Sequence, residues 1–310
     1  MDITKAIIPA AGLGSRFLPY TKTIPKEMLP LMNKPAIQFS IEEALNSGIR
    51  HFSIVTSKGK NAIADHLDFS HDLEILLKDR DITKLDLLSE LKHITNSAYF
   101  TYVRQSEPLG LGHAVWLARH AIGKESFGIF LPDDIFFGKP SAMEQMLCVA
   151  RQEKASIIAV REVPSSSVNQ YGIIEIRKQL TPNLFHVSSV IEKPDYRNAP
   201  SNLAIVGRYI LSYKVFDALE EISSNEQHGE IQLTDGIAQM IRKNEKVYAY
   251  KIRGTHYDIG TPLGWLKATV GCALQDPKYR PQLKQYIEEL EMPENMFTLS
   301  QDISHHLNHE

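Results

Sequence analysis

Residues 10–26 combine small side chains with cations in a pattern that suits the binding of phosphate groups. The small residues come first and the cations follow, and they are Ala10, Ala11, Gly12 and Gly14, then Arg16, Lys22 and Lys26. Missing side chains let a nucleotide lie against the backbone and meet its N–H groups. A structural turn would explain the two glycines, but not the small residues before them or the cations after them. We therefore interpret the segment as a phosphate-binding loop.

The spacing of these residues excludes two common nucleotide-binding loops. A P-loop requires G-x-x-x-x-G-K-[ST], and no window of the chain supplies this pattern. A dinucleotide-binding loop requires G-x-G-x-x-G, but Phe17 stands where the third glycine would let a helix pack closely on the strand. Hydride transfer is therefore disfavoured.

Acidic residues far apart in the chain are suited to holding a metal ion. Asp133 and Asp134 follow the apolar run FGIFL and a proline, so they lie at the carboxyl end of an expected central strand, where open α/β sheets bind ligands. Asp258, in the run HYDIG, also ends an expected strand before a glycine. We expect Asp133 and Asp258 to bind Mg²⁺, which proteins typically hold with one or two carboxylates plus phosphates and waters. A turn or a helix cap is the structural alternative for these aspartates.

The glycine-rich segment resembles the signature of the sugar-nucleotide pyrophosphorylases, G-x-G-[TS]-R followed about ten residues later by P-K-x-[ML]. Here these motifs are GLGSR at 12–16 and PKEM at 25–28. Ser15 stands where the family more often has Thr, and either hydroxyl can donate to a phosphate. Further segments over about residues 3–275 are similar to the bacterial UTP–glucose-1-phosphate uridylyltransferase family, and they are PKEMLP, VRQSEPLGLGHAV, LPDD, EKP, SNLAIVGRY and GEIQLTD.

This resemblance implies a reaction in which UTP and glucose 1-phosphate give UDP-glucose and pyrophosphate. The sugar phosphate would attack the α-phosphate, and because it is already close to a dianion at neutral pH, no general base is needed. The protein must supply positioning and positive charge along the in-line path. By the resemblance, Arg16 and Lys26 meet the nucleotide phosphates, Lys193 of EKP holds the sugar phosphate, and Asp133 matches the metal aspartate. An exposed, solvated lysine is the alternative for Lys193.

Recognition of the base is assigned to a second group of residues. Gln105 follows an expected strand, and its amide can both donate and accept, which matches the edge of a uracil. The glycine turn at Gly110 would let the backbone approach the base, and the resemblance places Glu27 near it. His113 is interpreted as a residue of a helix start or of the core, and not as a catalyst.

Sugar recognition is assigned to the second half of the chain. Glu192 can accept hydrogen bonds from vicinal hydroxyls, and Gly172 and Gly207 would let the hexose approach the backbone. These two glycines are also compatible with β-bulges. Glu230 and Asp235 are expected to begin a helix, where negative charge is favourable, so we leave them out of the site.

The composition describes an ordinary globular chain. Its 310 residues are 43% hydrophobic and 23% charged, which allows a large core. A formal charge of −3 without long basic runs argues against a nucleic-acid partner. With no run of 18 apolar residues and no apolar leader, we expect neither membrane insertion nor secretion. Cys148 and Cys272 stand alone, which indicates two buried thiols in a reducing cytoplasm and argues against a disulfide or zinc site.

Alternating strand and helix patterns predict βαβ units and an α/β class, with a mixed, mostly parallel central sheet flanked by helices. With the resemblance, this is a Rossmann-like nucleotidyltransferase fold. Leucines near helical spacing over 71–93 predict a helical insertion. Strands are expected at 5–9, 51–56, 98–103, 127–131, 155–161, 171–177, 186–193, 204–211 and 246–252. Helices are expected at 35–48, 58–67, 112–121, 231–243 and 262–274.

These elements predict one nucleotidyltransferase domain over residues 1–280. By the resemblance, its nucleotide-binding half covers about residues 1–150 and its sugar-binding half about residues 151–280. Residues 281–310 are expected to form a helix and a polar tail that contains three histidines. The resemblance also suggests a homodimer or a homotetramer.

Two alternatives remain open at the level of the sequence. One is another sugar-1-phosphate nucleotidyltransferase, of the thymidylyl type, whose pocket admits a methyl group on the base. The other is a non-catalytic regulatory relative, which should have lost a charged position of the site. Arg16, Lys26, Asp133 and Lys193 are all present, which disfavours the second alternative.

Overall fold

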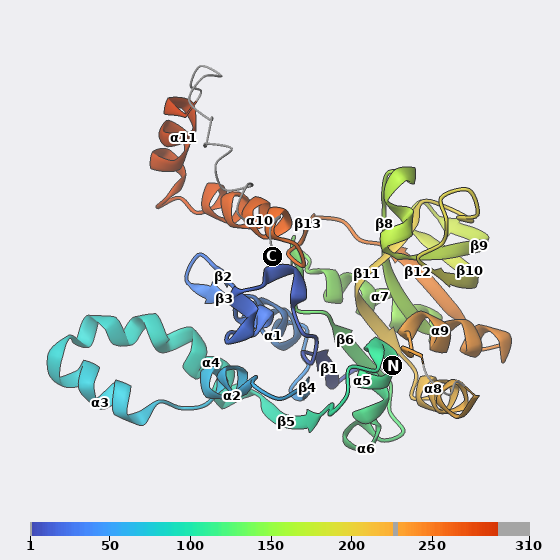
Figure 1. Ribbon diagram of the computed structural model, residues 1–310, viewed down its shortest axis with the longest axis horizontal. Helices are drawn as coiled ribbons and strands as arrows, with labels where there is room; N and C mark the ends of the chain where they lie inside the picture. The colour runs from blue at the N-terminus through green and yellow to red at the C-terminus, as the bar shows by residue number, and fades with distance from the viewer. Residues whose placement is uncertain (1, 226–228, 291–310) are drawn as a thin grey trace, which may run out of the picture.

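A nine-stranded sheet forms the centre of the protein, whose computed structural model describes residues 2–225 and 229–290 (Figure 1). Every strand expected from the sequence is present, with ends that differ by a few residues. In spatial order the strands are β5 (Tyr99–Arg104), β4 (His51–Thr56), β1 (Lys5–Pro9), β6 (Phe127–Phe130), β11 (Leu203–Leu211), β8 (Ser156–Glu162), β12 (Val247–Lys251), β10 (Leu184–Glu192) and β9 (Gly172–Thr181).

The sheet is parallel in its first half and mixed in its second. Strands β5, β4, β1 and β6 pair in parallel, as do β8 and β12, whereas β10 and β11 run opposite to their neighbours. The expected α/β class with a mixed, mostly parallel sheet is therefore confirmed. Strand β6 pairs with β1 on one side and β11 on the other, so one continuous sheet joins the two halves of the chain.

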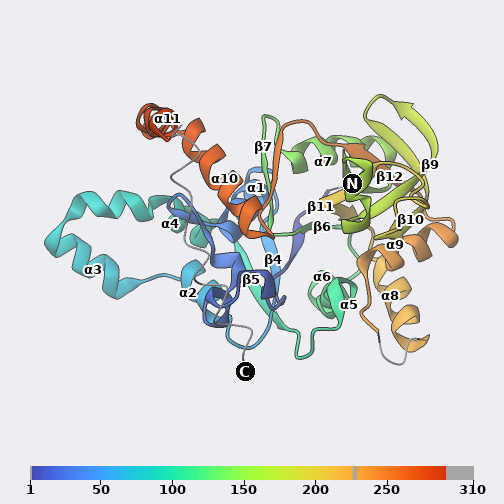
Figure 2. The ribbon, with the colours of Figure 1, turned by 45° about the horizontal axis from the view of Figure 1, so that its top comes forward.

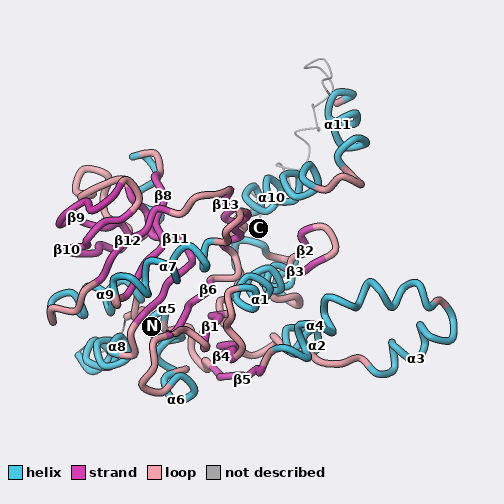
Figure 3. Tube along the Cα trace, turned by 180° about the vertical axis from the view of Figure 1, so that it is seen from behind, coloured by secondary structure: helices cyan, strands magenta, loops and turns pink. Residues whose placement is uncertain are grey.

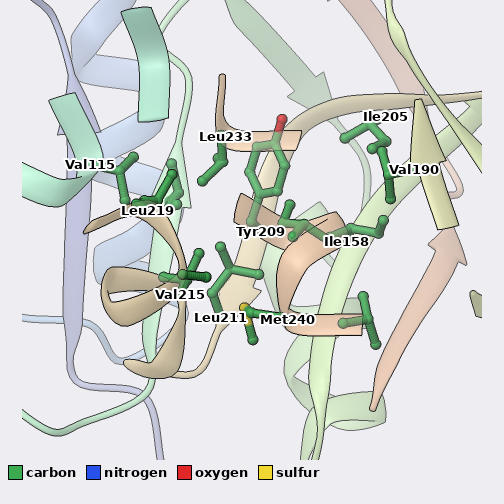
Figure 4. Packing of buried hydrophobic residues seen from close by; sticks show 14 of the residues in the cluster. Val115, Ile158, Val190, Ile205, Tyr209, Leu211, Val215, Leu219, Leu233 and Met240 are labelled. Carbon is green, nitrogen blue, oxygen red and sulfur yellow. The ribbon is translucent and has the colours of Figure 1, made fainter. Parts of the chain in front are cut away.

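Helices cover both faces of this sheet. Successive side chains of a strand point to opposite faces, so each central strand contributes apolar residues to a core on either side. In β1, Ile7 belongs to one buried cluster and Ala6 and Ile8 to the other. Figure 4 shows the first cluster, where Leu233 lies close to Tyr209 of β11. The helices on this face are α5 (Gly110–Leu117), α6 (Arg119–Ile122), α8 (Lys214–Asn225) and α9 (Leu233–Arg242). Those on the other face are α1 (Ala36–Asn46), α2 (Asn61–Leu67), α4 (Ser89–Ser97) and α7 (Ala142–Glu153).

Helix α7 shows how local sequence sets an element and its exposed face. A capping box begins it: the Ser141 side chain accepts from the Glu144 backbone, and the Glu144 carboxylate accepts from the Ser141 backbone. Cys148 lies one turn beyond Glu144 on the same solvent-facing side and is exposed, while Cys272 is half-buried. The expectation of two buried thiols is therefore wrong.

The helical insertion is present and stands out from the body in both Figure 1 and Figure 3. It contains α3 (His71–Arg80), a 3₁₀ segment η4 (Ile82–Leu88) and α4. The break falls at Asp81, whose carboxylate accepts a hydrogen bond from the backbone of Thr83. No residue of α3 is buried, so its leucines do not form a core-facing stripe.

The last described elements return to the first part of the chain. Strand β13 (Thr255–Asp258) pairs antiparallel with β7 (Asp134–Phe137) in a separate two-stranded sheet. Helices α10 (Pro262–Gln275) and α11 (Arg280–Glu289) follow (Figure 2). Residues 291–310, where a polar tail was expected, lie outside the described residues. Within the described chain, no helix has the length and apolar character needed to cross a membrane.

Candidate active site

The glycine-rich loop follows β1 directly and is closed by its own side chains. Gly14 has a φ of +68°, and a Cβ there would lie 3.1 Å from the Thr21 side chain, so only glycine fits without strain. The Thr21 hydroxyl donates to the Gly14 carbonyl at 2.8 Å. This contact folds the loop back on itself and leaves its backbone along a pocket.

The pocket beside this loop, named the glycine-loop pocket, has a volume of about 370 Å³. Its lining comes from β1, the loop, the turn after β5 and the end of β6. Ala10 does not line it, because its side chain is fully buried in the core below. The predicted site residues that line it are Ala11, Gly12, Gly14, Lys26, Glu27, Gln105, Gly110 and Asp133.

Lys26 and Asp133 form the central ion pair of this pocket, with Nζ and Oδ2 2.5 Å apart. Burial lowers the pKa of Lys26, but attraction from Asp133 and Glu27 outweighs it and holds that pKa above the usual 10.5. Burial alone would raise the pKa of Asp133, yet Lys26 outweighs that effect and holds it below 3.8. Both groups are therefore charged at neutral pH and face the space where phosphates would enter.

Glu27 lines the pocket, and its carboxylate forms a buried ion pair with Lys60. Its two carboxylate oxygens lie 2.8 and 2.7 Å from the Lys60 ammonium, and the two residues are only 2% and 8% exposed. Burial raises the pKa of Glu27 and lowers that of Lys60, while each partner opposes the shift of the other. Lys60 thus neutralises a carboxylate that lies next to Lys26.

Gln105 is held in one orientation by groups of the following turn. Its side-chain nitrogen lies 3.2 Å from the Gly110 carbonyl and 3.0 Å from Nδ1 of His113. Burial lowers the pKa of His113, which favours the neutral ring that can accept this hydrogen bond. The amide nitrogen is therefore committed to the protein, and the carbonyl oxygen of Gln105 remains to accept from a ligand.

Gly110 is required by both its conformation and its surroundings. It has a φ of +94°, and a Cβ would approach the Ile231 carbonyl to 2.6 Å. The Ile231 backbone also donates to Leu109 and accepts from Gly112, at 2.9 and 2.8 Å. The segment before α9 thus closes the turn beside the pocket, and it places Glu230 in the pocket lining, which the sequence analysis left out.

A second pocket, named the Glu192 pocket, adjoins the first and has a volume of about 290 Å³. Leu111, Leu131 and Asp133 line both pockets, so the two meet at the end of β6. The predicted site residues that line the Glu192 pocket are Arg16, Asp133, Gly172, Glu192, Lys193 and Gly207.

The two predicted glycines of this pocket are crowded by neighbouring side chains. A Cβ at Gly172 would lie 2.7 Å from the side chain of Thr234, and one at Gly207 would lie 2.4 Å from Oδ2 of Asp134. The pairing of β11 with β8 also changes register between Ile205 and Tyr209, around Gly207. Packing therefore requires a glycine at both positions.

The EKP segment places a carboxylate and an ammonium at the mouth of the Glu192 pocket. Oε2 of Glu192 accepts from the Thr234 hydroxyl at 2.9 Å, and Oε1 lies 3.4 Å from the Lys193 ammonium. Lys193 has a φ of +43°, an uncommon conformation for a residue with a side chain, and its N–H donates to the Tyr171 carbonyl at 3.0 Å. Its side chain is half-exposed.

Asp258 lies beside Asp133 although the two are far apart in the chain. The register of β13 on β7 pairs Asp258 with Asp134, and the N–H of Ile259 donates to the Asp133 carbonyl at 2.8 Å. A Cβ at Gly260 would lie 3.0 Å from Oδ1 of Asp258 and 3.3 Å from Oδ2 of Asp133. Oδ1 of Asp258, which accepts from the Gly260 N–H at 2.9 Å, and Oδ2 of Asp133 therefore both lie next to Gly260.

This pair of carboxylates suits a hard divalent cation. Burial and the negative charge of Asp134 raise the pKa of Asp258, so a bound cation would relieve repulsion there. The described residues contain no cluster of three or more His, Cys, Asp or Glu suited to a metal ion. Two carboxylates with phosphates and waters as further ligands match the usual coordination of Mg²⁺.

Several residues near the site were not identified from the sequence. Lys60 follows the carboxyl end of β4, a position that could have indicated it, because parallel strands present ligands there. Asp134, Arg161 and His256 form a hydrogen-bonded chain behind the aspartates. No local pattern indicates that chain, because its members come from three different strands.

Comparisons with known proteins agree with this geometry. A family model described as Nucleotidyl transferase matches residues 5–273. A Staphylococcus epidermidis protein named UTP–glucose-1-phosphate uridylyltransferase is 45% identical over 293 residues, covering 94% of this chain and 99% of its own. A Bacillus subtilis protein of the same name is 46% identical over 290 residues, covering 93% of this chain and 97% of its own.

Solved structures show the same similarity. A UDP-glucose pyrophosphorylase from Acinetobacter baumannii has a TM-score of 0.84 at 38% identity, covering 94% of this chain and 100% of that one. A UDP-glucose pyrophosphorylase complexed with UDP-glucose has a TM-score of 0.79 at 37% identity, covering 89% of this chain and 100% of that one.

Proposed function

The chain belongs to the nucleotidyl transferase family, and we propose that it transfers uridylyl from UTP to glucose 1-phosphate, releasing UDP-glucose and pyrophosphate. The observation that carries this proposal is the meeting of the glycine-loop pocket and the Glu192 pocket at Asp133. A nucleotide in the first pocket and a sugar phosphate in the second would bring their phosphates together there. The names of the full-length relatives support this reaction.

We assign the base of UTP to the part of the glycine-loop pocket near Gln105 and Gly110. The carbonyl oxygen of Gln105 can accept from N3–H of uracil, because its nitrogen is already bound to Gly110 and His113. Cytosine has no hydrogen at N3 and would leave this acceptor unpaired. Thymine has the same N3–H, so this contact favours UTP over CTP but does not separate UTP from dTTP.

The reaction needs positive charge at the junction of the pockets. Arg16 and Lys26 would bind the nucleotide phosphates, and Lys193 would bind the phosphate of the sugar, whose hydroxyls lie near Glu192. These cations lower the repulsion between a triphosphate and an attacking phosphate dianion and hold the two in line. No nucleophile of the protein is needed, because the phosphate of the sugar would attack directly.

Asp133 and Asp258 would hold the divalent cation, and Mg²⁺ is the ion that we propose. When bound, the cation would neutralise phosphate charge during transfer. Asp133 also pairs with Lys26, at 2.5 Å.

We also propose that about residues 1–150 bind the nucleotide and about residues 151–280 bind the sugar. We propose that the protein assembles as a homodimer or a homotetramer. A cytoplasmic location is supported by the two free cysteines, Cys148 and Cys272.

The decisive experiment measures pyrophosphate release by the purified protein with Mg²⁺ and glucose 1-phosphate. UTP is compared with dTTP, ATP, CTP and GTP. We expect a strong preference for UTP. A preference for dTTP would keep the mechanism and assign the chain to the thymidylyl type, and silence with every nucleotide would refute the proposal.

A further inference from the structure

Both carboxylate oxygens of Asp134, the residue after Asp133, hold a hydrogen bond within the protein. Its Oδ2 accepts a hydrogen bond from the backbone N–H of Gly207 at 3.1 Å, and its Oδ1 forms a short hydrogen bond with Nε2 of His256. Gly207 belongs to β11 and His256 to β13. Asp134 therefore links the central sheet to the two-stranded sheet.

His256 extends this link to Arg161. The guanidinium Nη1 of Arg161 lies 2.7 Å from Nδ1 of His256. Because a guanidinium can only donate, Nδ1 must be the acceptor, and the ring proton must be on Nε2, where it donates to Asp134. The ring also stacks on Phe136, with centroids 4.5 Å apart. Arg161 of β8 thus donates to His256 of β13, which in turn donates to Asp134 of β7.

The position of His256 in β13 connects this chain to the cation site. His256 and Asp258 are two residues apart in one strand, so their side chains leave the same face. Strand β13 has four residues and pairs with β7 alone within its sheet. Such a short two-stranded unit is weakly stabilised by its backbone, and side-chain contacts must fix its orientation.

We propose that the Arg161–His256–Asp134 chain positions Asp258 next to Asp133 and thereby sets the affinity of the site for its divalent cation. Arg161 and His256 act as positioning residues, since their hydrogen bonds lead to Asp134 and not to Asp133 or Asp258. The proposal rests on the proposed function only in that Asp133 and Asp258 hold the cation. It assigns a role to Arg161 and His256, which line neither pocket, and to Asp134, which lines the Glu192 pocket.

The test measures binding of Mn²⁺, the probe ion, from the electron paramagnetic resonance signal of the free ion. His256→Phe keeps a ring against Phe136 but removes both hydrogen bonds, and we expect it to weaken Mn²⁺ binding about tenfold, as changes behind metal ligands commonly do. Arg161→Met should weaken binding less, because it removes only the outer hydrogen bond. His256→Gln should restore part of the affinity, because its amide can donate to Asp134.

Controls separate positioning from general stability. Arg177→Met removes an exposed arginine of β9 and should leave Mn²⁺ binding unchanged. Thermal unfolding is measured for every variant, and kinetics should show a raised Mg²⁺ activation constant with nearly unchanged kcat at saturating Mg²⁺.

Two outcomes would overturn the proposal. One is unchanged Mn²⁺ affinity in both His256→Phe and Arg161→Met, even with lowered thermal stability, because the chain would then be structural only. The other is failure of the unmodified protein to bind Mn²⁺ both alone and with UDP-glucose. A protein that binds Mn²⁺ but makes no UDP-glucose would refute the proposed function and leave this test intact.

Discussion

The ammonium group of Lys26 lies 2.5 Å from Oδ2 of Asp133, across a separation of 107 residues in the chain. Lys26 belongs to the short helix η3 (Lys26–Met28) after the glycine-rich loop, and Asp133 follows β6. This contact joins the phosphate-binding segment to the expected cation site. It also places the ammonium group of Lys26 next to Asp133, where the two pockets meet.

Replacing Lys26 by Met should lower kcat about 100-fold or more, the usual loss for a charge that stabilises a transition state. The side chain keeps its length, so the loss would report charge and not packing. Steady-state kinetics with UTP and glucose 1-phosphate would measure it.

Lys34 offers a matched control for this change. It is 24% exposed against 23% for Lys26, and it also forms ion pairs with carboxylates, Glu42 and Glu90. It lines neither pocket. Lys34→Met should therefore retain kcat, and an equal loss in both variants would remove Lys26 from the reaction.

Replacing Lys60 by Met should destabilise the protein by about 3 kcal/mol near neutral pH, because Glu27 would be left buried and unpaired. Burial already holds the pKa of Glu27 above 4.5, and the variant loses the opposing effect of Lys60. The folded variant then binds a proton more readily than its unfolded chain, so its stability falls as pH rises from 4.5 through the folded pKa. Urea unfolding should show a smaller loss relative to wild type at pH 5 than at pH 7.5.

The double variant Glu27→Gln with Lys60→Met tests that explanation. It removes the titrating carboxyl together with its partner, so part of the stability should return and the added dependence on pH should disappear. A loss that is equal at both pH values in the single variant would contradict the role of Glu27.

Replacing Gly110 by Ala should cost about 3 kcal/mol of stability and raise KM for UTP. The backbone conformation at this position is strained for alanine, and the added Cβ would also clash with the Ile231 carbonyl. Gly48 separates the two effects: its φ is +89°, close to that of Gly110, but nothing lies within 4 Å of an added Cβ. Gly48→Ala should therefore cost only about 1 kcal/mol. Similar losses in urea unfolding would show that crowding at Ile231 is unimportant.

Replacing Lys193 by Met should raise KM for glucose 1-phosphate about tenfold, the typical worth of one charged hydrogen bond, while KM for UTP changes little. The side chain is half-exposed, so stability should be unaffected. Lys178→Met, at an exposed position of β9, serves as the control. Unchanged KM for the sugar phosphate in Lys193→Met would exclude this lysine from the sugar site.

The amino-acid sequence by itself determined the fold class and the segments from which the candidate site is built. Strands such as β1 and β4 are short apolar runs, and the glycine-rich loop with its following cations is a local pattern. Such patterns reflect interactions within a few residues, so they can be recognised without knowing how the chain folds. The α/β class therefore followed from the order of the elements.

Only the tertiary structure decided which of these residues meet. The approach of Asp258 to Asp133 depends on the register of β13 against β7, and the Glu27–Lys60 pair depends on how the loop packs beside β4. The sequence also did not indicate that Ala10 is buried, that Cys148 is exposed, or that Asp134 is hydrogen-bonded to His256. These contacts join residues that are distant in sequence. The order and register of the strands and the face that each helix buries depend on burial of apolar side chains over the whole chain, so no local sequence pattern reveals them.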